Sequence, residues 1–279
     1  MRQRGDTSFA DLLNALRVGE LKGPHFELLM TKTLKEPTGE FALNKAIRIY
    51  PTRKMVEDHN NSVLQYYRSQ GIRIYKIESQ DRIIDSGRNA DKIDMSKVVS
   101  NDINKTGGLQ KELEIFLGAK VMLRANIIVE KGLVNGAIGN ITEIHWPNFR
   151  RDQIDKDIPD LSIDFGPDGI HRIEPRCVEF DGKLNYGKVE RRQLPIILCW
   201  ACTVHKMQGC TVDHAVVYLG PALFETGQAY VALSRVRSLE GVRIVELDCS
   251  KLTGKKPCNE ECLQEMERMR RHEPAADPE

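Results

Sequence analysis

The first apolar pattern in the chain is helical. Residues 6–18 carry apolar side chains at helical spacing, which are Phe9, Leu12, Leu13 and Leu16. Ser8 or Asp11 can cap this helix, and Gly19 with the Gly23-Pro24 pair is expected to end it. We expect the helix to pack on a core through its apolar face.

A strand followed by a helix comes next. Residues 46–50 (AIRIY) alternate and predict a strand that Pro51 ends. Thr52 then begins a helix whose inward face carries Met55, His59 and Val63. Free amide groups at a helix N-terminus attract anions. Thr52 is therefore either a cap alone or a cap that also contacts a phosphate, and the sequence leaves both readings open.

The middle of the chain is polar at first and then β-rich. Residues 76–108 are polar, so we expect a surface segment that contributes little to the core. Residues 109–117 are expected to form a helical or extended connector. From residue 118 to 192, short alternating runs are separated by glycines and other turn residues. Strands are predicted at 121–123, 127–129, 141–144, 161–165, 169–173 and 177–180. This number of short strands favours a small barrel or curled sheet, and the acidic stretch 152–160 predicts a solvated turn.

The stretch 194–211 (LPIILCWACTVHKMQGCT) changes from apolar to polar within a few residues. Leu194–Trp200 predicts one buried strand. The polar residues would then emerge at its carboxyl end, where open α/β sheets place their ligands. Another apolar run at 215–219 continues the α/β pattern, and a short helix is predicted at 260–271. The predicted fold class is an α/β domain built from two segments, with a small β-rich insertion between them.

Composition narrows the class of protein. The chain has 279 residues, of which 41% are hydrophobic and 29% charged, as in globular proteins. The net charge of +1 excludes a uniformly basic nucleic-acid coat but permits a local basic groove. No apolar run is long enough to cross a membrane, and the first residues lack a secretory cleavage site. With seven cysteines and no disulfide spacing, we expect an intracellular, reducing environment.

Two groups of cysteines have spacings that metal or redox sites also use. Cys199 and Cys202 have the spacing of a redox or zinc half-site, but they lie in an apolar run, which favours packing. Cys258, Cys262 and His272 supply three ligands on a polar tail, which is weak evidence for zinc. We therefore predict no metal site.

The polar residues that follow the apolar run have the chemistry of a phosphate contact. Thr203 and His205 can each donate a hydrogen bond to a phosphodiester oxygen. Gln208 can orient a water or a phosphate, and Gly209 allows a backbone to approach a ligand closely. The alternative is a polar strand end whose histidine is satisfied within the protein.

A second polar feature lies at residues 227–237 (GQAYVALSRVR). A helix here would turn Ala229, Leu233 and Val236 inward and present Arg235 at its opposite edge or end. An arginine held rigidly by a helix can stabilise charge on a transferring γ-phosphate, as an arginine finger does. Arg237 is the competing candidate, and the alternative is that both are solvated helix charges.

The two stretches together resemble the second RecA-like motor domain of superfamily-one DNA helicases, in the Pif-like and RecD-like group that includes Helitron transposon helicases. Residues 203–211 resemble motif V and residues 230–238 resemble motif VI. Residues 47–60 resemble motif IV, and residues 118–141 resemble the segment that leads into an inserted barrel domain. The resemblance spans about residues 2–248. Met207 departs from it, since the group usually has a small residue there, and the larger side chain could crowd the site.

The resemblance implies a role for each matching residue. Arg235 would be the arginine finger, while Gln208, Gly209 and Arg237 would lie near the nucleotide. Contacts to single-stranded DNA would come from Thr52, Thr203, His205 and Lys206. The implied domains are residues 1–117 and 193–250 for the two segments of the motor domain, 118–192 for the insertion and 251–279 for a polar tail.

One motif that the group needs for ATP is absent. A phosphate-binding loop reads G-x-x-x-x-G-K-[ST], but the Gly-Lys pairs here precede Leu184, Val189 and Lys256. The resemblance thus implies the C-terminal half of a 5′-to-3′ ATP-dependent DNA helicase, nuclear in a eukaryote, with work in repair, recombination or telomere maintenance. ATP and Mg²⁺ would bind only with a missing N-terminal motor domain. The alternative is a stand-alone or degenerate module, such as a transposon remnant, that binds single-stranded DNA without ATPase activity.

Overall fold

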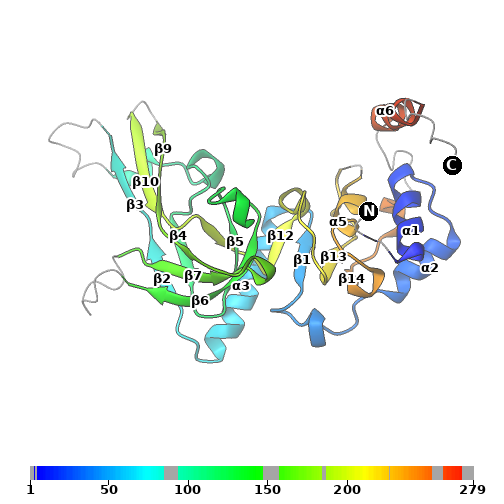
Figure 1. Ribbon diagram of the computed structural model, residues 1–279, viewed down its shortest axis with the longest axis horizontal. Helices are drawn as coiled ribbons and strands as arrows, with labels where there is room; N and C mark the ends of the chain where they lie inside the picture. Colours follow the sequence, from blue (N-terminus) through cyan, green and yellow to red (C-terminus); the bar gives the residue numbers. More distant parts are fainter. Residues whose placement is uncertain are drawn as a thin grey trace. The chain divides into compact units, whose positions relative to one another are not determined.

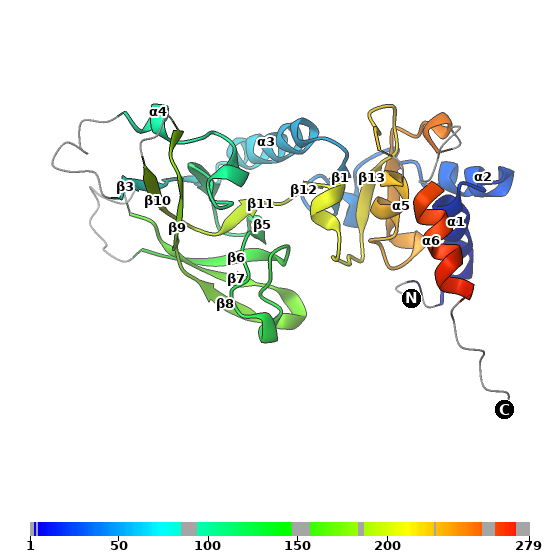
Figure 2. The ribbon, with the colours of Figure 1, turned by 90° about the horizontal axis from the view of Figure 1, so that it is seen from above.

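The chain folds into two compact units. The structure, a computed structural model, describes residues 3, 5–84, 94–146, 157–183, 187–225, 227–252 and 260–271. Unit 1 comprises Met1–Asn61 and Trp200–Glu279, and unit 2 comprises Ser62–Cys199. Figures 1 and 2 together label the helices and strands of both units.

The α-helices are α1 Thr7–Val18, α2 Gly23–Thr31, α3 Arg53–Ser69, α4 Met95–Val98, α5 Gln228–Leu233 and α6 Glu260–Arg271. The strands are β1 Ile47–Tyr50, β2 Tyr75–Glu78, β3 Gln80–Ile83, β4 Glu112–Ile115, β5 Lys120–Leu123, β6 Ile138–His145, β7 Asp160–Asp164, β8 Ile170–Ile173, β9 Arg176–Asp181, β10 Lys188–Gln193, β11 Ile196–Leu198, β12 Ala201–Thr203, β13 Ala215–Tyr218 and β14 Val242–Val245.

Unit 1 is built on a parallel sheet of four strands in the order β12-β1-β13-β14. Ile49 of β1 lies opposite Cys202 on one side and Val217 on the other. All three side chains are fully buried. A parallel sheet covered on both faces favours continuous apolar runs such as the AVVY of β13. Strand β1 (IRIY) keeps the predicted alternation, although its Arg48 is also buried.

Helix α1 confirms the first sequence pattern, because its predicted apolar face is buried. Its cap is Asp6, whose carboxylate accepts a hydrogen bond from the Phe9 amide at 3.0 Å, so the expectation of a Ser8 or Asp11 cap was wrong. The other Asp6 oxygen accepts from the Leu239 amide at 2.8 Å and ties the helix to the chain before β14. Helix α1 packs beside α5, as Figure 2 shows.

The Gly23-Pro24 pair begins a helix where the sequence predicted only an end. Pro24 lies in the first turn of α2, a position that needs no amide hydrogen. A proline next to a glycine is thus compatible with either a stop or a start. The interpretation as a terminator missed this second possibility.

Unit 2 consists of antiparallel sheets. The largest has the order β11-β5-β6-β7-β8, a second has β3-β10-β9, and β2 pairs with β4. Strands β6, β7, β8 and β9 agree with the predicted positions within a few residues, whereas Val129 lies in a 3₁₀ turn rather than a strand. No hydrogen-bonded pair between described strands closes a barrel, so the predicted barrel is not confirmed.

The apolar run Leu194–Trp200 is not one strand. Ile196–Leu198 form β11, which pairs antiparallel with β5 in unit 2. The chain then enters β12 at Ala201 and pairs parallel with β1 in unit 1. Both strands need buried apolar residues, so the sequence shows no break where the sheets change.

Residues 76–108 contribute more core than predicted. Val98 and Val99 form a buried cluster with Val189, and Ile77 is almost fully buried. The stretch 85–93 lies outside the described residues, as does most of the predicted acidic turn at 152–160. The polar residues that suggested a surface excursion are partly used inside the unit, in a network around Arg191.

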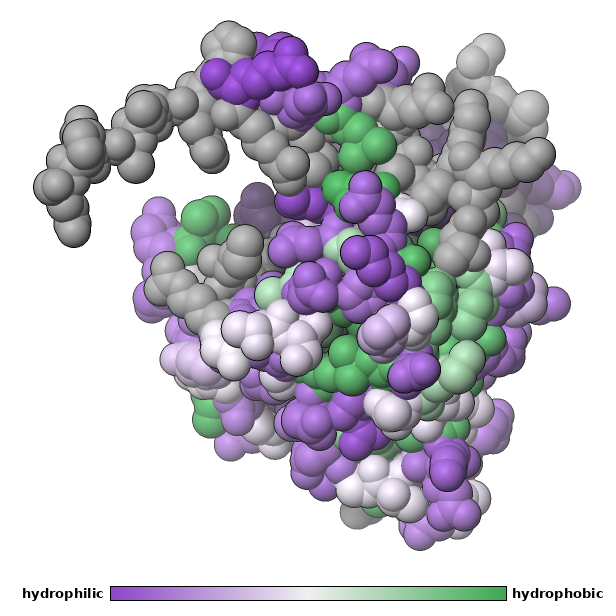
Figure 3. Space-filling view, turned by 90° about the vertical axis from the view of Figure 1, so that its right-hand side faces the viewer, coloured by the Kyte–Doolittle hydropathy of each residue, from purple (hydrophilic) through white to green (hydrophobic). Residues whose placement is uncertain are grey.

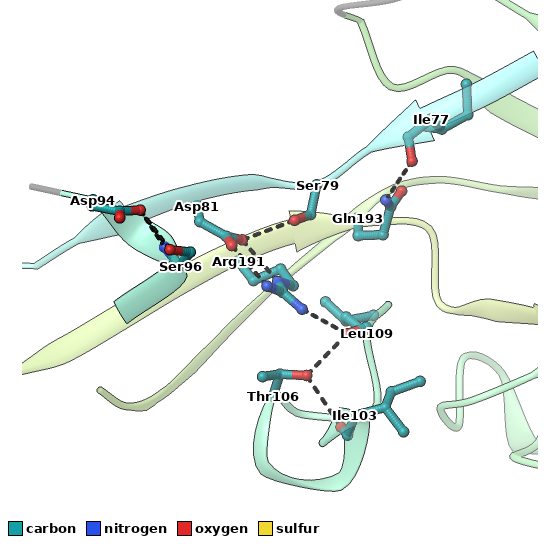
Figure 4. A network of polar contacts seen from close by, with 10 residues as sticks. All are labelled: Ile77, Ser79, Asp81, Asp94, Ser96, Ile103, Thr106, Leu109, Arg191 and Gln193. Carbon is teal, nitrogen blue, oxygen red and sulfur yellow. Dashed lines mark hydrogen bonds and ion pairs between the residues drawn. The ribbon is translucent and has the colours of Figure 1, made fainter. Parts of the chain in front are cut away.

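That network joins strand β10 to the segment before β4 (Figure 4). The Arg191 guanidinium donates two hydrogen bonds of 2.7 Å to the Asp81 carboxylate and one of 3.0 Å to the Leu109 carbonyl. Thr106 donates to carbonyls within the same turn. Arg191 is 2% exposed, so this is a buried ion pair that also fixes the turn 103–109.

The two units divide the chain differently from the predicted domains. Residues 62–117, which the sequence placed in the motor domain, belong to unit 2 because β2, β3 and β4 pair with one another or with β10. The motor-domain boundaries stay a prediction. In the described part of the chain, no helix has the length and apolar character needed to span a membrane. The face in Figure 3 is largely hydrophilic, with hydrophobic patches between the polar residues.

Unit 1 contains a histidine whose burial makes stability depend on pH. His59 of α3 is 9% exposed, and burial followed by the positive charge of Arg48 lowers its pKa to about 4. The unfolded chain, with an ordinary histidine pKa of about 6.5, therefore binds this proton more readily than the folded chain. Stability from His59 is complete above about pH 6.5 and is lost as the pH falls toward 4.

We expect His59 to cost the fold about 2 kcal/mol between about pH 7.5 and about pH 5. Urea unfolding at the two pH values measures this loss. His59→Gln has no titrating group at this position and should show a correspondingly smaller loss. An equal loss in both proteins would show that other groups cause the pH dependence.

Candidate functional site

The predicted DNA-contact residues meet at the carboxyl edge of the parallel sheet in unit 1. Tyr50 at the end of β1 lies opposite Thr203 at the end of β12. Thr52 follows β1, and a 3₁₀ turn, η7 Val204–Met207, follows β12. Strand β1 has neighbours on both sides, and ligands of open α/β sheets bind outside such carboxyl ends.

Thr52 is a helix cap. Its hydroxyl oxygen accepts a hydrogen bond from the Met55 amide at 3.3 Å, at the start of α3. This confirms the capping role that the sequence left open beside a phosphate contact. The hydroxyl is half-buried and keeps its own hydrogen for a further acceptor, so the phosphate contact stays a prediction.

Turn η7 separates an apolar side from a polar side. Val204 and Met207 are buried, while His205, Gln208 and Gly209 are exposed. Met207 is 0% exposed, so its larger side chain fills the core beneath the turn and does not crowd the polar face. Gly209 has φ +88°, a conformation that strains any residue with a Cβ atom. The glycine is therefore needed for the turn itself, whatever approaches it.

His205 has an acidic neighbour that the sequence did not reveal. Its Nε2 lies 3.3 Å from the Glu225 carboxylate, and both side chains are about half exposed. Glu225 lies in the loop after β13, twenty residues further along the chain. A phosphate that approaches His205 must compete with this carboxylate. No local pattern signals such a pairing, because it depends on how the loop folds back.

The loop that carries Glu225 is held by Gln228. The buried Gln228 side chain accepts a hydrogen bond from the Phe224 amide at 3.3 Å. Gln228 also lines a cavity of about 180 Å³, together with Leu16, Tyr230 and Lys251. In the sequence, Gln228 was only one residue of the stretch 227–237. Its buried position and its hydrogen bond to Phe224 indicate that it helps to position the loop.

Arg235 and Arg237 lie just after the end of α5, because the helix ends at Leu233, before the predicted helical position Val236. The Arg235 guanidinium turns back and donates to the Val231 carbonyl at 2.9 Å and to the Ser234 hydroxyl at 2.7 Å. Arg237 is exposed and pairs with Asp213 at 3.3 Å. The two arginines therefore have different settings, one tied to the helix end and one at the surface.

Helix α5 connects the arginines with the polar turn. It packs against η7, and Val236 forms a parallel bridge with Val212 just before β13. Hydrogen bonds at both ends of this bridge, Val212 N to Arg235 O at 3.0 Å and Arg237 N to Val212 O at 3.2 Å, fix the backbone of both arginines. A movement of Arg235 can thus reach His205 and Gln208 through one packed helix.

Metal ligands do not gather in the described parts of either unit. No group of three His, Cys, Asp or Glu side chains there is arranged to hold an ion. Cys199 and Cys202 are both fully buried, in agreement with packing. Cys258 and His272 of the predicted weak zinc group lie outside the described residues.

Comparisons with known proteins match both the sequence and the fold. Residues 99–144 match the family described as DNA helicase Pif1, 2B domain. The ATP-dependent DNA helicase PIF1 of Danio rerio is 30% identical over 250 residues, which cover 89% of this chain and 34% of that protein. The corresponding protein of Emericella nidulans is 28% identical over 90% of this chain and 37% of its own length.

Solved structures agree in fold. Pif1 helicase from Candida albicans has a TM-score of 0.71 and 25% identity, covering 98% of this chain and 60% of that one. Bacteroides Pif1 bound to single-stranded DNA has a TM-score of 0.63 and 23% identity, covering 96% and 55%. The chain spans about a third of the length of the curated relatives that it matches. By sequence and fold, the chain belongs to the Pif1-like group of superfamily-one helicases.

Proposed function

We propose that this chain is the second motor domain, with its inserted domain, of an ATP-dependent DNA helicase that moves 5′ to 3′ on single-stranded DNA. The observation that carries the proposal is the edge where Thr52, Thr203 and His205 meet at the carboxyl ends of β1 and β12. Relatives that match most of the chain are ATP-dependent DNA helicases. Nuclear work in DNA repair or recombination belongs to the same proposal.

DNA would bind along this edge through its phosphates. The Thr52 and Thr203 hydroxyls and the His205 ring can donate hydrogen bonds to phosphodiester oxygens, and Lys206 adds a positive charge. These contacts carry no sequence information, as a motor that steps along any strand requires. The ion pair between the His205 ring and the Glu225 carboxylate would break when a phosphate takes the place of the carboxylate.

Nucleotide would be shared with a first motor domain. This chain has no phosphate-binding loop, so ATP and Mg²⁺ would be held mainly by that partner domain. Hydrolysis of the bound ATP would supply the free energy for movement. Arg235 would leave the helix end to stabilise charge on the γ-phosphate, with Arg237 and Gln208 nearby. Because α5 packs on η7, this change would reach the DNA contacts.

The isolated chain should bind single-stranded DNA and show no ATPase activity above background. Anisotropy with a labelled oligothymidylate measures binding, and log K should fall with log salt by about 0.7 per phosphate contacted. Glu225→Gln should tighten binding by about two- to fivefold at low salt, because it removes the carboxylate that competes at His205.

The control is the same substitution in a His205→Ala background, where the gain should largely disappear. Binding that does not respond to salt, or an equal gain with and without His205, would contradict the DNA edge. ATP hydrolysis by the chain alone would contradict the need for a partner domain.

A further inference from the structure

Two arginines of unit 2 contact the same turn, and only one of them is satisfied there. The turn 103–109 is fixed by Arg191, whose guanidinium is paired with Asp81 and bonded to the Leu109 carbonyl (Figure 4). Arg124 lies against the other side of the turn. A Cβ atom on Gly108 would stand 3.7 Å from the Arg124 Nη2 and 3.8 Å from its Nε.

The Arg124 guanidinium lacks the partners that a buried cation normally has. Its Nε is buried and has no hydrogen-bond acceptor among the described residues. The whole side chain is partly exposed, so the rest of the group can reach solvent. Burial alone lowers the pKa of Arg124, and no acidic side chain opposes that shift. An unpaired, partly desolvated cation is costly for the protein alone, and the cost falls when an anion binds.

The backbone of Arg124 is tied to a neighbouring strand connection. Its amide donates to the Pro195 carbonyl at 2.8 Å, directly after β5. Gly107 and Gly108 both have positive φ, a conformation that favours glycine, and Gly108 lies in van der Waals reach of the Arg124 guanidinium. The segment after Arg124 is held by Arg176, whose Nη1 donates to the Asn126 carbonyl at 3.0 Å.

We propose that Arg124 binds a phosphate group of a nucleic-acid backbone on unit 2. The ligand is a phosphodiester, because the planar guanidinium presents several donors that match phosphate oxygens. The proposal rests on the proposed function, which brings single-stranded DNA to this chain. It adds a contact in unit 2 to those at the sheet edge of unit 1.

Arg124→Met tests the site, because methionine keeps an unbranched apolar stem and removes the cation. Binding of the labelled oligothymidylate to the full chain should weaken about tenfold, and the salt slope should decrease by about one phosphate contact. The melting temperature should stay level or rise, since an unpaired charge has been removed. Arg124→Lys should retain part of the affinity.

Arg82→Met is the matched control. It removes the same charge from the same unit, but Arg82 is 75% exposed and already paired with Glu190. It should leave affinity and salt slope near those of the unsubstituted chain. Equal losses of affinity in the two variants would show that only the net charge of the chain matters, which would overturn the proposal. Unchanged binding by Arg124→Met would overturn it as well.

A second arm separates this site from the proposed function. Inorganic phosphate, compared with chloride at equal ionic strength, should raise the melting temperature of the unsubstituted chain but not of Arg124→Met. If the chain binds no oligonucleotide, the proposed function fails. If phosphate still stabilised the unsubstituted chain but not Arg124→Met, Arg124 would bind an anion, and the proposal that this anion is nucleic acid would be wrong. An equal effect in both proteins, or none in either, would overturn the site itself.

Discussion

Arg235→Ala should slow ATP hydrolysis about a thousandfold in a helicase assembled from this chain and a first motor domain that carries a phosphate-binding loop. An arginine finger acts on charge that develops in the transition state. The loss should therefore appear in kcat, with little change in KM for ATP. At about 4 kcal/mol, this is the largest effect on activity that we expect from a single substitution.

The present setting of Arg235 is compatible with the proposed role. Its guanidinium binds the Val231 carbonyl and the Ser234 hydroxyl, both neutral acceptors at the end of α5. A γ-phosphate is a stronger acceptor because it is charged, so it can displace both bonds. The backbone bridge to Val212 keeps the residue in position while the side chain swings.

Arg237 provides the matched control, two residues further along. It is exposed, and its partner Asp213 is a surface carboxylate. We expect Arg237→Ala to reduce kcat by less than about tenfold. The measurement is steady-state ATPase activity, with the first motor domain of a Pif1 relative joined to this chain. DNA binding of both variants should match the unsubstituted fusion. A kcat that falls more for Arg237→Ala would move the finger to that residue.

The sequence predicted the sheet edge well because its signals are local. The polar residues do follow a strand, but that strand is β12 Ala201–Thr203 and not the predicted Leu194–Trp200. Thr203 is its last residue, and His205 to Gly209 lie beyond its end. The cap at Thr52 follows from the same kind of signal, a proline-threonine turn before a helical pattern. Periodicity also found α1 and the strands β5 to β9 of unit 2, but not β2, β3, β4 or β10.

Features that depend on distant partners could not be predicted. The run Leu194–Trp200 is apolar throughout, so nothing in it marks the change from an antiparallel to a parallel sheet. Glu225 meets His205 only because a loop folds back. Arg191 sits in an alternating, charged strand (KVERRQ), and its burial follows from Asp81 on a strand far away in the sequence.

Arg191→Met should lower the free energy of unfolding of unit 2 by about 3–5 kcal/mol. Asp81 lies directly opposite on β3, and its side chain is only 10% exposed. Without Arg191, this carboxylate keeps the Ser79 hydroxyl as a donor but loses two charged hydrogen bonds. The Leu109 carbonyl loses its donor as well, so the turn 103–109 should open.

The next pair on the same two strands shows what burial contributes. Arg82 and Glu190 are also opposite each other on β3 and β10, with Nε 2.7 Å from the carboxylate, but Arg82 is 75% exposed. Arg82→Met should cost less than about 1 kcal/mol, because solvent screens the pair.

Urea unfolding measures the losses of both Arg191→Met and Arg82→Met, and hydrogen exchange should locate the Arg191→Met effect in residues 77–83 and 103–115. Adding Asp81→Leu should recover much of the stability, since a buried ion pair can be replaced by apolar side chains but not halved. Equal costs for Arg191→Met and Arg82→Met would mean that the buried pair contributes no more than its exposed neighbour.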